Sequence, residues 1–237
     1  MIAAMTVQET PDWSGRLRHV RDHCADHGLD AFVVSTPHNL TYLSGFRGTA
    51  GLLVTTPKEH RLLVDGRYVS IAAEAMVAAG LSEVQVERVE RRYDLTLGAL
   101  LDRLGAARVA FEAEHVTVAT LAMWQRAAGS VVWQPSERVI ETQRAVKDAF
   151  EIAVMRRAGR ALSDVAREIG WWIRAGRTEI EIARDVDAAL DRVGFSAPAF
   201  PTIAASGANS AHPHARPGAR RLAPGDLVLL DFGGILD

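Results

Sequence analysis

The feature of the sequence that most constrains the fold is the alternation of short apolar runs with amphipathic segments over residues 12–133. Leu17 and Val20 lie at helical spacing in residues 12–27, and the run Ala31-Phe32-Val33-Val34 that follows is typical of a buried strand. Leu52–Val54 and Leu62–Val64, separated by a polar segment, predict an antiparallel hairpin. The alternation then continues with helices at 69–77, 94–104 and 116–128 and strands at 84–89, 109–111 and 131–133. This pattern predicts an α/β domain.

Beyond residue 144 the pattern changes to two long helices. Apolar residues between Ile152 and Trp172 recur every three or four positions, which is the spacing of one helical face. Thr178 and Glu181 have the spacing of a capping box and predict the start of a second helix. A domain boundary near residues 135–144 follows from this change. We therefore predict one domain over residues 1–140 and a second over residues 144–237.

The second domain contains an aspartate in an apolar setting. The run Leu227–Leu230 predicts a buried strand that ends on Asp231, and the period of two places Asp231 on the same face as Leu227 and Leu229. An ionised carboxylate among leucines is costly unless a cation, a metal or hydrogen bonds compensate it. Asp231 is therefore a metal ligand or a structural anchor, and the residues alone leave both roles open.

Two histidines precede this strand, in Ala211-His212-Pro213-His214-Ala215. Pro224-Gly225-Asp226 predicts a tight turn between them and Asp231, so His214 can reach the same cleft as the carboxylate. A lone histidine beside a proline is more often a surface loop residue. We expect His212 to be exposed in the loop.

Composition and charge limit the partners and the cellular compartment that the sequence allows. The formal net charge of −2 argues against binding of nucleic acid through bulk electrostatics. The single cysteine, Cys24, has no internal partner for a disulfide, which favours a reducing compartment. Because the N-terminal segment lacks the pattern of a signal peptide and no apolar run is long enough for a membrane span, we expect a cytoplasmic protein with no membrane partner.

The motifs around His214 and Asp231 resemble those of a known family. Pro213-His214, then Gly225-Asp226, the apolar strand Leu227–Leu230 and finally Asp231-Phe232-Gly233 match, in order and spacing, the M24 "pita-bread" metallopeptidases, which include Xaa-Pro aminopeptidases and prolidases. Phe200–Ile203 and Ser206-Gly207-Ala208-Asn209 resemble the strand that precedes the family's histidine.

The first domain carries a resemblance of its own. Tyr42–Phe46, Gly48–Gly51 and Asp65–Tyr68 are similar to the creatinase-type N-terminal domain that accompanies these peptidases. Arg144–Asp148 resembles the start of the family's first catalytic-domain helix. The expected fold is therefore a creatinase-like N-terminal α/β domain followed by an incomplete pita-bread α+β catalytic domain.

The resemblance implies a function and roles for two residues. It implies an enzyme that hydrolyses Xaa-Pro bonds of a proline-containing peptide with a water activated by two divalent ions, Mn or Co and possibly Zn, and that forms a homodimer. Asp231 would bind the metals, and His214 would be the catalytic histidine that hydrogen-bonds the substrate. Two alternatives remain: a metal-free, creatinase-like amidinohydrolase, which Asp231 disfavours, and a non-catalytic binding protein that keeps the peptidase fold.

The sequence departs from the family pattern after Asp231. Family members carry a second aspartate ligand in a Gly-Tyr-x-x-Asp-x-Thr-Arg context, followed later by a histidine and two glutamates, and these are missing from the residues before Asp237. Asp237 cannot replace that ligand, because six extended residues span about 20 Å whereas two bridged metals lie about 3.5 to 4 Å apart. We therefore expect a catalytic-domain fragment that is inactive by itself.

Overall fold

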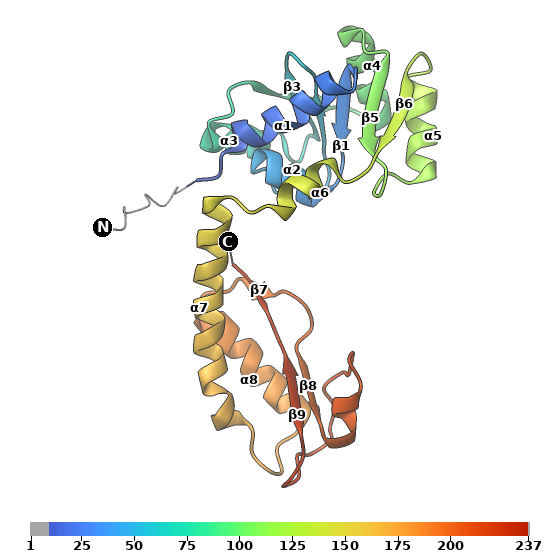
Figure 1. The fold of residues 1–237 in the computed structure, drawn as a ribbon. Helices are drawn as coiled ribbons and strands as arrows, with labels where there is room; N and C mark the ends of the chain where they lie inside the picture. The colour runs from blue at the N-terminus through green and yellow to red at the C-terminus, as the bar shows by residue number, and fades with distance from the viewer. Residues whose placement is uncertain (1–9, 237) are drawn as a thin grey trace, which may run out of the picture. The chain divides into compact units, whose positions relative to one another are not determined.

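The structure is a computed structural model that describes residues 10–236 of the 237. The chain divides into two compact units between Asp148 and Ala149 (Figure 1). We call residues 10–148 the N-terminal unit and residues 149–236 the C-terminal unit. Asp237, considered above as a substitute ligand, lies outside the described residues.

A six-stranded mixed sheet forms the centre of the N-terminal unit, in the order β4-β3-β2-β1-β5-β6. The strands are β1 (Ala31–Val34), β2 (Leu52–Thr55), β3 (His60–Asp65), β4 (Val84–Val89), β5 (Arg108–Glu112) and β6 (Val132–Ser136). β2 pairs antiparallel with β1 and β3, which confirms the predicted hairpin, and the other neighbours are parallel.

Helices cover both faces of this sheet (Figure 1). They are α1 (Trp13–Asp26), α2 (Pro37–Ser44), α3 (Val69–Ala79), α4 (Tyr93–Leu104), α5 (Val118–Ala127) and α6 (Val139–Ala145). Phe32 and Val34 of β1 pack in the core with α1, α2, α3 and α6, whereas Ala31 and Val33 pack with α4 and α5. Because both faces of β1 are buried, its sequence is a continuous apolar run without polar alternation.

Two of these helices were not predicted from the sequence. Pro37 occupies the start of α2, where its missing N–H costs no hydrogen bond, and Gly45 ends the helix with φ +70°. Helix α6 lies where the sequence suggested a linker, and buried Val139 and Ile140 hold it in the N-terminal core. As a result, the observed division lies several residues after the predicted boundary segment.

Polar contacts also hold the end of the N-terminal unit in place. The guanidinium of Arg16, itself buried, pairs with Asp148 at 2.7 Å, and Arg144 donates to Asn39 Oδ1 at 2.9 Å. Cys24 is fully buried in the same core, and burial raises the pKa of its thiol to about 12. Its thiol is therefore protonated and unreactive near neutral pH.

Limited trypsin digestion of the 237-residue chain should yield a stable fragment that ends at Lys147. Lys147 is exposed between α6 and α7, and both faces of the N-terminal sheet are covered from within residues 10–148. Cleavage requires exposed backbone with little local structure, which this segment provides. Mass spectrometry of the digest identifies the product. Equally rapid loss of both units would contradict an independently stable N-terminal domain.

The C-terminal unit consists of two helices and two short antiparallel ladders. Its elements are α7 (Ala149–Trp172), α8 (Glu179–Arg192), β7 (Ala197–Pro198), β8 (Ile203–Ser206), the 3-10 helix η1 (Gly207–Ala211), β9 (Val228–Asp231) and β10 (Gly234–Ile235). β8 pairs with β9, and β7 pairs with β10. Val165 of α7 and Val186 and Leu190 of α8 form a buried core with Phe195.

Two local predictions are confirmed in this unit. The capping box at the start of α8 is complete, because Thr178 accepts from Glu181 N–H and Glu181 accepts from Thr178 N–H. The turn before β9 also forms: Asp226 N–H donates to Ala223 C=O at 3.1 Å, and Gly225 has φ +88°, a conformation that favours glycine.

Candidate active site

Asp231 is the last residue of β9, where it lies opposite Ile203 of β8. Val228 and Leu230 pack against the core beneath α8, so Leu229 and Asp231 point to the other face. The predicted shared face of Leu227, Leu229 and Asp231 is confirmed, but the prediction that this face is buried is wrong. Leu227 is 72% and Leu229 37% exposed, because α8 covers one face of the β8–β9 ladder only.

The Asp231 carboxylate is exposed and, within residues 10–236, has no hydrogen-bonding or ionic partner. Its oxygens suit a hard divalent cation. Nevertheless, the described residues contain no group of three or more His, Cys, Asp or Glu side chains arranged to hold a metal ion. Asp231 therefore has the chemistry of a ligand for such an ion, but the described residues do not supply the number of ligands that the ion needs.

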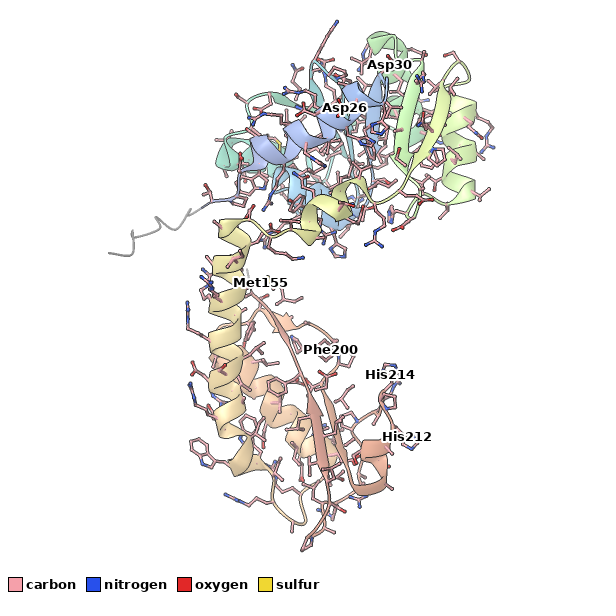
Figure 2. The ribbon with its side chains drawn as sticks, viewed as in Figure 1. Asp26, Asp30, Met155, Phe200, His212 and His214 are labelled. Carbon is pink, nitrogen blue, oxygen red and sulfur yellow. The ribbon has the colours of Figure 1, made fainter. Side chains whose placement is uncertain are left out.

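His214 lies in the loop that follows η1. A turn in this loop is closed by a hydrogen bond from Ala215 N–H to His212 C=O, at 3.1 Å. His212 and His214 are both exposed, and Figure 2 shows their side chains projecting from the loop. The predicted exposure of His212 is confirmed. Exposure alone therefore does not distinguish the two histidines.

The structure places His214 and Asp231 in the same unit without direct contact. Asp231 lies at one end of the β8–β9 ladder, and the loop with His214 leaves β8 at Ser206 by the other end, about 10 Å away along the strand. In the part of the chain that the structure describes, no hydrogen bond links the two side chains. The surface around His214 is hollowed and lined by Asn209, His212, Pro213, Ala215 and Arg216.

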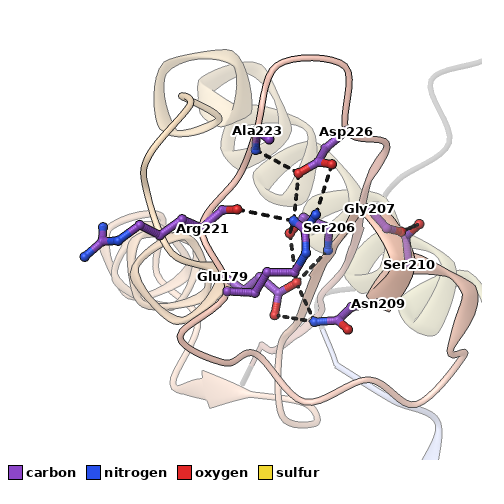
Figure 3. Close-up of polar contacts among 9 residues, drawn as sticks. Glu179, Ser206, Gly207, Asn209, Ser210, Arg221, Ala223 and Asp226 are labelled. Carbon is purple, nitrogen blue, oxygen red and sulfur yellow. Dashed lines mark hydrogen bonds and ion pairs between the residues drawn. The ribbon is translucent and has the colours of Figure 1, made fainter.

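A buried carboxylate that the sequence analysis missed organises this loop. Glu179, the first residue of α8, is 1% exposed. It accepts hydrogen bonds from Ser206 N–H at 2.7 Å, Ser206 Oγ at 2.9 Å and Asn209 Nδ2 at 3.0 Å (Figure 3). It also accepts one from Gly218 N–H at 3.2 Å. The capping-box pattern identified its neighbours Thr178 and Glu181, but no periodicity indicated that Glu179 itself is buried.

Arg220 adds a second layer to this network. It donates to Ser206 Oγ at 2.6 Å and to the two oxygens of Asp226 at 2.7 and 3.1 Å. Asp226 also accepts from Ala223 N–H at 2.8 Å, within the turn before β9 (Figure 3). The motif segments around Ser206 and Asp226, far apart in sequence, thus belong to one polar network.

The electrostatics of the network favour the ionised carboxylates. Burial raises the pKa of Glu179, but the hydrogen bonds from Ser206, Asn209 and Gly218 outweigh it, so the net pKa lies below its ordinary value. The hydrogen bond from Arg220 likewise lowers the pKa of Asp226. Because both pKa values are depressed, the network's contribution to stability is present near neutral pH and is lost as the pH falls through them.

Comparison with known proteins connects this geometry to a family. Residues 16–146 match the Creatinase/Prolidase N-terminal domain, and residues 153–237 match Metallopeptidase family M24. The chain belongs to the M24 metallopeptidases that carry a creatinase/prolidase N-terminal domain. Both the fold and the family expected from the sequence are confirmed.

Relatives within the M24 family agree with this assignment. The chain is 26% identical over 223 residues to the uncharacterized peptidase YqhT of Bacillus subtilis (strain 168), covering 92% of this chain and 60% of YqhT. It is similar to the X-Pro aminopeptidase of Thermotoga maritima MSB8, with 27% identity, a TM-score of 0.78, and coverage of 88% of this chain and 59% of that one. The Xaa-Pro dipeptidase of Bacillus anthracis shares the fold, with a TM-score of 0.87 and 24% identity over 94% of this chain and 61% of that one.

The chain thus spans about 60% of the length of the M24 relatives that it matches. Within residues 10–236, no helix combines the length and the apolar character that crossing a membrane requires.

Proposed function

We propose that the full-length protein is a metal-dependent peptidase that hydrolyses Xaa-Pro bonds, and that residues 1–237 supply one metal ligand and one substrate-binding histidine. Family membership and the names of the relatives support this activity. The observation that carries the proposal is the placement of Asp231 and His214. Both side chains are exposed in one unit, and each lies on the motif by which the family resemblance assigned its role.

Each residue has a distinct role in this proposal. Asp231, an open carboxylate at a strand end, is the metal ligand. His214 donates a hydrogen bond from one imidazole nitrogen to the carbonyl oxygen of the scissile bond, which becomes negatively charged as a nucleophile attacks. Two divalent ions, proposed to be Mn or Co and possibly Zn, would lower the pKa of a bridging water towards neutrality when bound. The remaining ligands must come from outside the described residues.

The cellular setting is part of the same proposal. A single buried cysteine is compatible with the cytoplasm, where thiols stay reduced. The homodimer and the proline-containing peptide substrate are proposed from the family resemblance.

Full-length protein purified from a peptidase-deficient host should cleave an Xaa-Pro dipeptide and leave the matching Xaa-Ala dipeptide largely intact. A chelator should remove the activity, and Mn²⁺ or Co²⁺ should restore it, because the ions generate the nucleophile. Chromatography of the released amino acids measures the reaction. The 237-residue chain, assayed in parallel, should be inactive because the described residues hold too few ligands.

Other outcomes of this assay would support the alternatives. Hydrolysis that persists in chelator would indicate metal-free, creatinase-like chemistry. Full-length protein that bound proline-containing peptides without cleaving them would be a binding protein. Chelator-sensitive cleavage by the 237-residue chain would contradict the proposed division of ligands.

A further inference from the structure

The loop that carries His214 is attached at both ends to one buried side chain. Glu179 binds Ser206 and Asn209 at the start of segment 206–218 and Gly218 at its end. Both carboxylate oxygens of Glu179 accept these hydrogen bonds. Oε1 accepts from Ser206 and Asn209, and Oε2 accepts from Asn209 and Gly218. A single carboxylate thus closes the loop.

Between these anchors the loop has little other support. Residues 211–214 are exposed, and η1 is a single short 3-10 helix. Backbone hydrogen bonds add a tie at each end of the segment. Gly207 N–H donates to Leu227 C=O at the start, and Ile180 N–H donates to Gly218 C=O and Glu179 N–H to Arg220 C=O at the C-terminal end. The position of His214 therefore depends on the anchors at the two ends more than on packing along the loop.

Helix capping alone does not explain why Glu179 is buried. The capping box of α8 is already formed by Thr178 and Glu181. The Glu179 side chain turns away from that box and contacts residues that lie 27 to 39 positions later in the sequence. Hydrogen bonds to an ionised carboxylate are about twice as strong as neutral ones, so this arrangement is suited to fixing a loop.

We propose that Glu179 is a positioning residue for His214: its carboxylate holds both ends of segment 206–218 and so sets where the histidine meets the substrate. Arg220 supports it by holding Ser206 from the other side and joining it to Asp226. The link to catalysis rests on the proposed function, whereas the attachment of the loop does not. A misplacement of about 1 Å in a catalytic group can cost about 100-fold in rate, so anchors of this kind affect turnover.

The attachment is tested by amide hydrogen exchange on the 237-residue chain with Glu179→Gln. The amide side chain keeps the size of the glutamate but loses its charge and presents an NH₂ group to Ser206 N–H or Gly218 N–H. Exchange in peptides that cover residues 203–218 should accelerate by about 10- to 100-fold, the equivalent of losing a charged hydrogen bond, with no change in the N-terminal sheet.

Glu181→Gln is the matched control, because Glu181 is a hydrogen-bonded carboxylate at the same helix terminus and contacts Thr178 rather than the loop. It should lower the melting temperature without accelerating exchange in residues 203–218. Asn209→Ala, which removes one anchor, should accelerate exchange to a smaller extent than Glu179→Gln. Equal exchange in this segment for Glu179→Gln and Glu181→Gln would overturn the proposal.

The link to His214 is tested by kinetics of the full-length enzyme. Glu179→Gln should lower kcat by about 10- to 100-fold with its metal content unchanged. In a His214→Ala background the same change should have little further effect on kcat, because Glu179 acts through the histidine. Additive losses would overturn the positioning role. A wild-type enzyme without Xaa-Pro activity would refute the proposed function and leave the exchange result intact.

Discussion

Asp231→Asn in the full-length protein should abolish metal binding and reduce peptidase activity by at least about 100-fold. An amide is a much weaker ligand than a carboxylate for a hard divalent ion, and it leaves the charge of the ion uncompensated. An ion that generates the nucleophile contributes several kcal/mol to catalysis, and each 1.36 kcal/mol is about tenfold in rate. Elemental analysis of protein dialysed against Mn²⁺ gives the metal content independently of activity.

Asp191→Asn is a suitable control for this prediction. Asp191 is an exposed carboxylate near the end of α8 in the same unit, and it carries the same formal charge. Its replacement should leave metal content and activity unchanged. Full metal occupancy in Asp231→Asn would refute the assignment of Asp231 as a ligand. In the metal-free 237-residue chain, where Asp231 is exposed on an uncovered strand face, its replacement should change the melting temperature little.

The sequence predicted most of the architecture, because the hydrophobic periodicity was clear and so were the residues that begin and end the helices and strands. The apolar run of β1, the hairpin of β2 and β3, and the capping box of α8 all formed as expected. Each of these features depends on residues that are close in sequence. For such features, hydrophobic periodicity and the residues that favour turns are sufficient for a prediction. The helices α2 and α6 were missed because both are short, and tertiary packing of a few side chains such as Leu40 and Ile140 stabilises them.

The candidate site was predictable only in part. Motif order gave His214 and Asp231 as candidates, and their roles stay predictions, but the environment of Asp231 was wrongly expected to be buried. An apolar run such as Leu227–Leu230 is typical of a strand that is covered on both faces in the folded protein. In the described residues only the face towards α8 is covered. Glu179 was missed because its partners Ser206, Asn209 and Gly218 are distant in sequence, and burial of a charged residue has no periodic signal.

His214→Ala and His212→Ala should separate the two exposed histidines that the structure alone does not distinguish. The first should lower kcat by about 100- to 1,000-fold, the cost of removing one donor to a developing oxyanion. The second should leave kcat within a few-fold of wild type. Both side chains are exposed in the 237-residue chain, so neither change should lower its melting temperature appreciably.

The metal content distinguishes the loss of activity expected for His214→Ala from the loss expected for Asp231→Asn. His214→Ala should retain its metals, because His214 contacts the substrate in the proposed mechanism, and its KM should change less than its kcat, since the hydrogen bond strengthens as charge develops on the carbonyl oxygen. Steady-state kinetics with an Xaa-Pro dipeptide, paired with elemental analysis, give both quantities. Equal losses of kcat in His214→Ala and His212→Ala would contradict a specific role of His214 in binding the substrate. Loss of metal from His214→Ala would contradict its placement on the substrate side of the site.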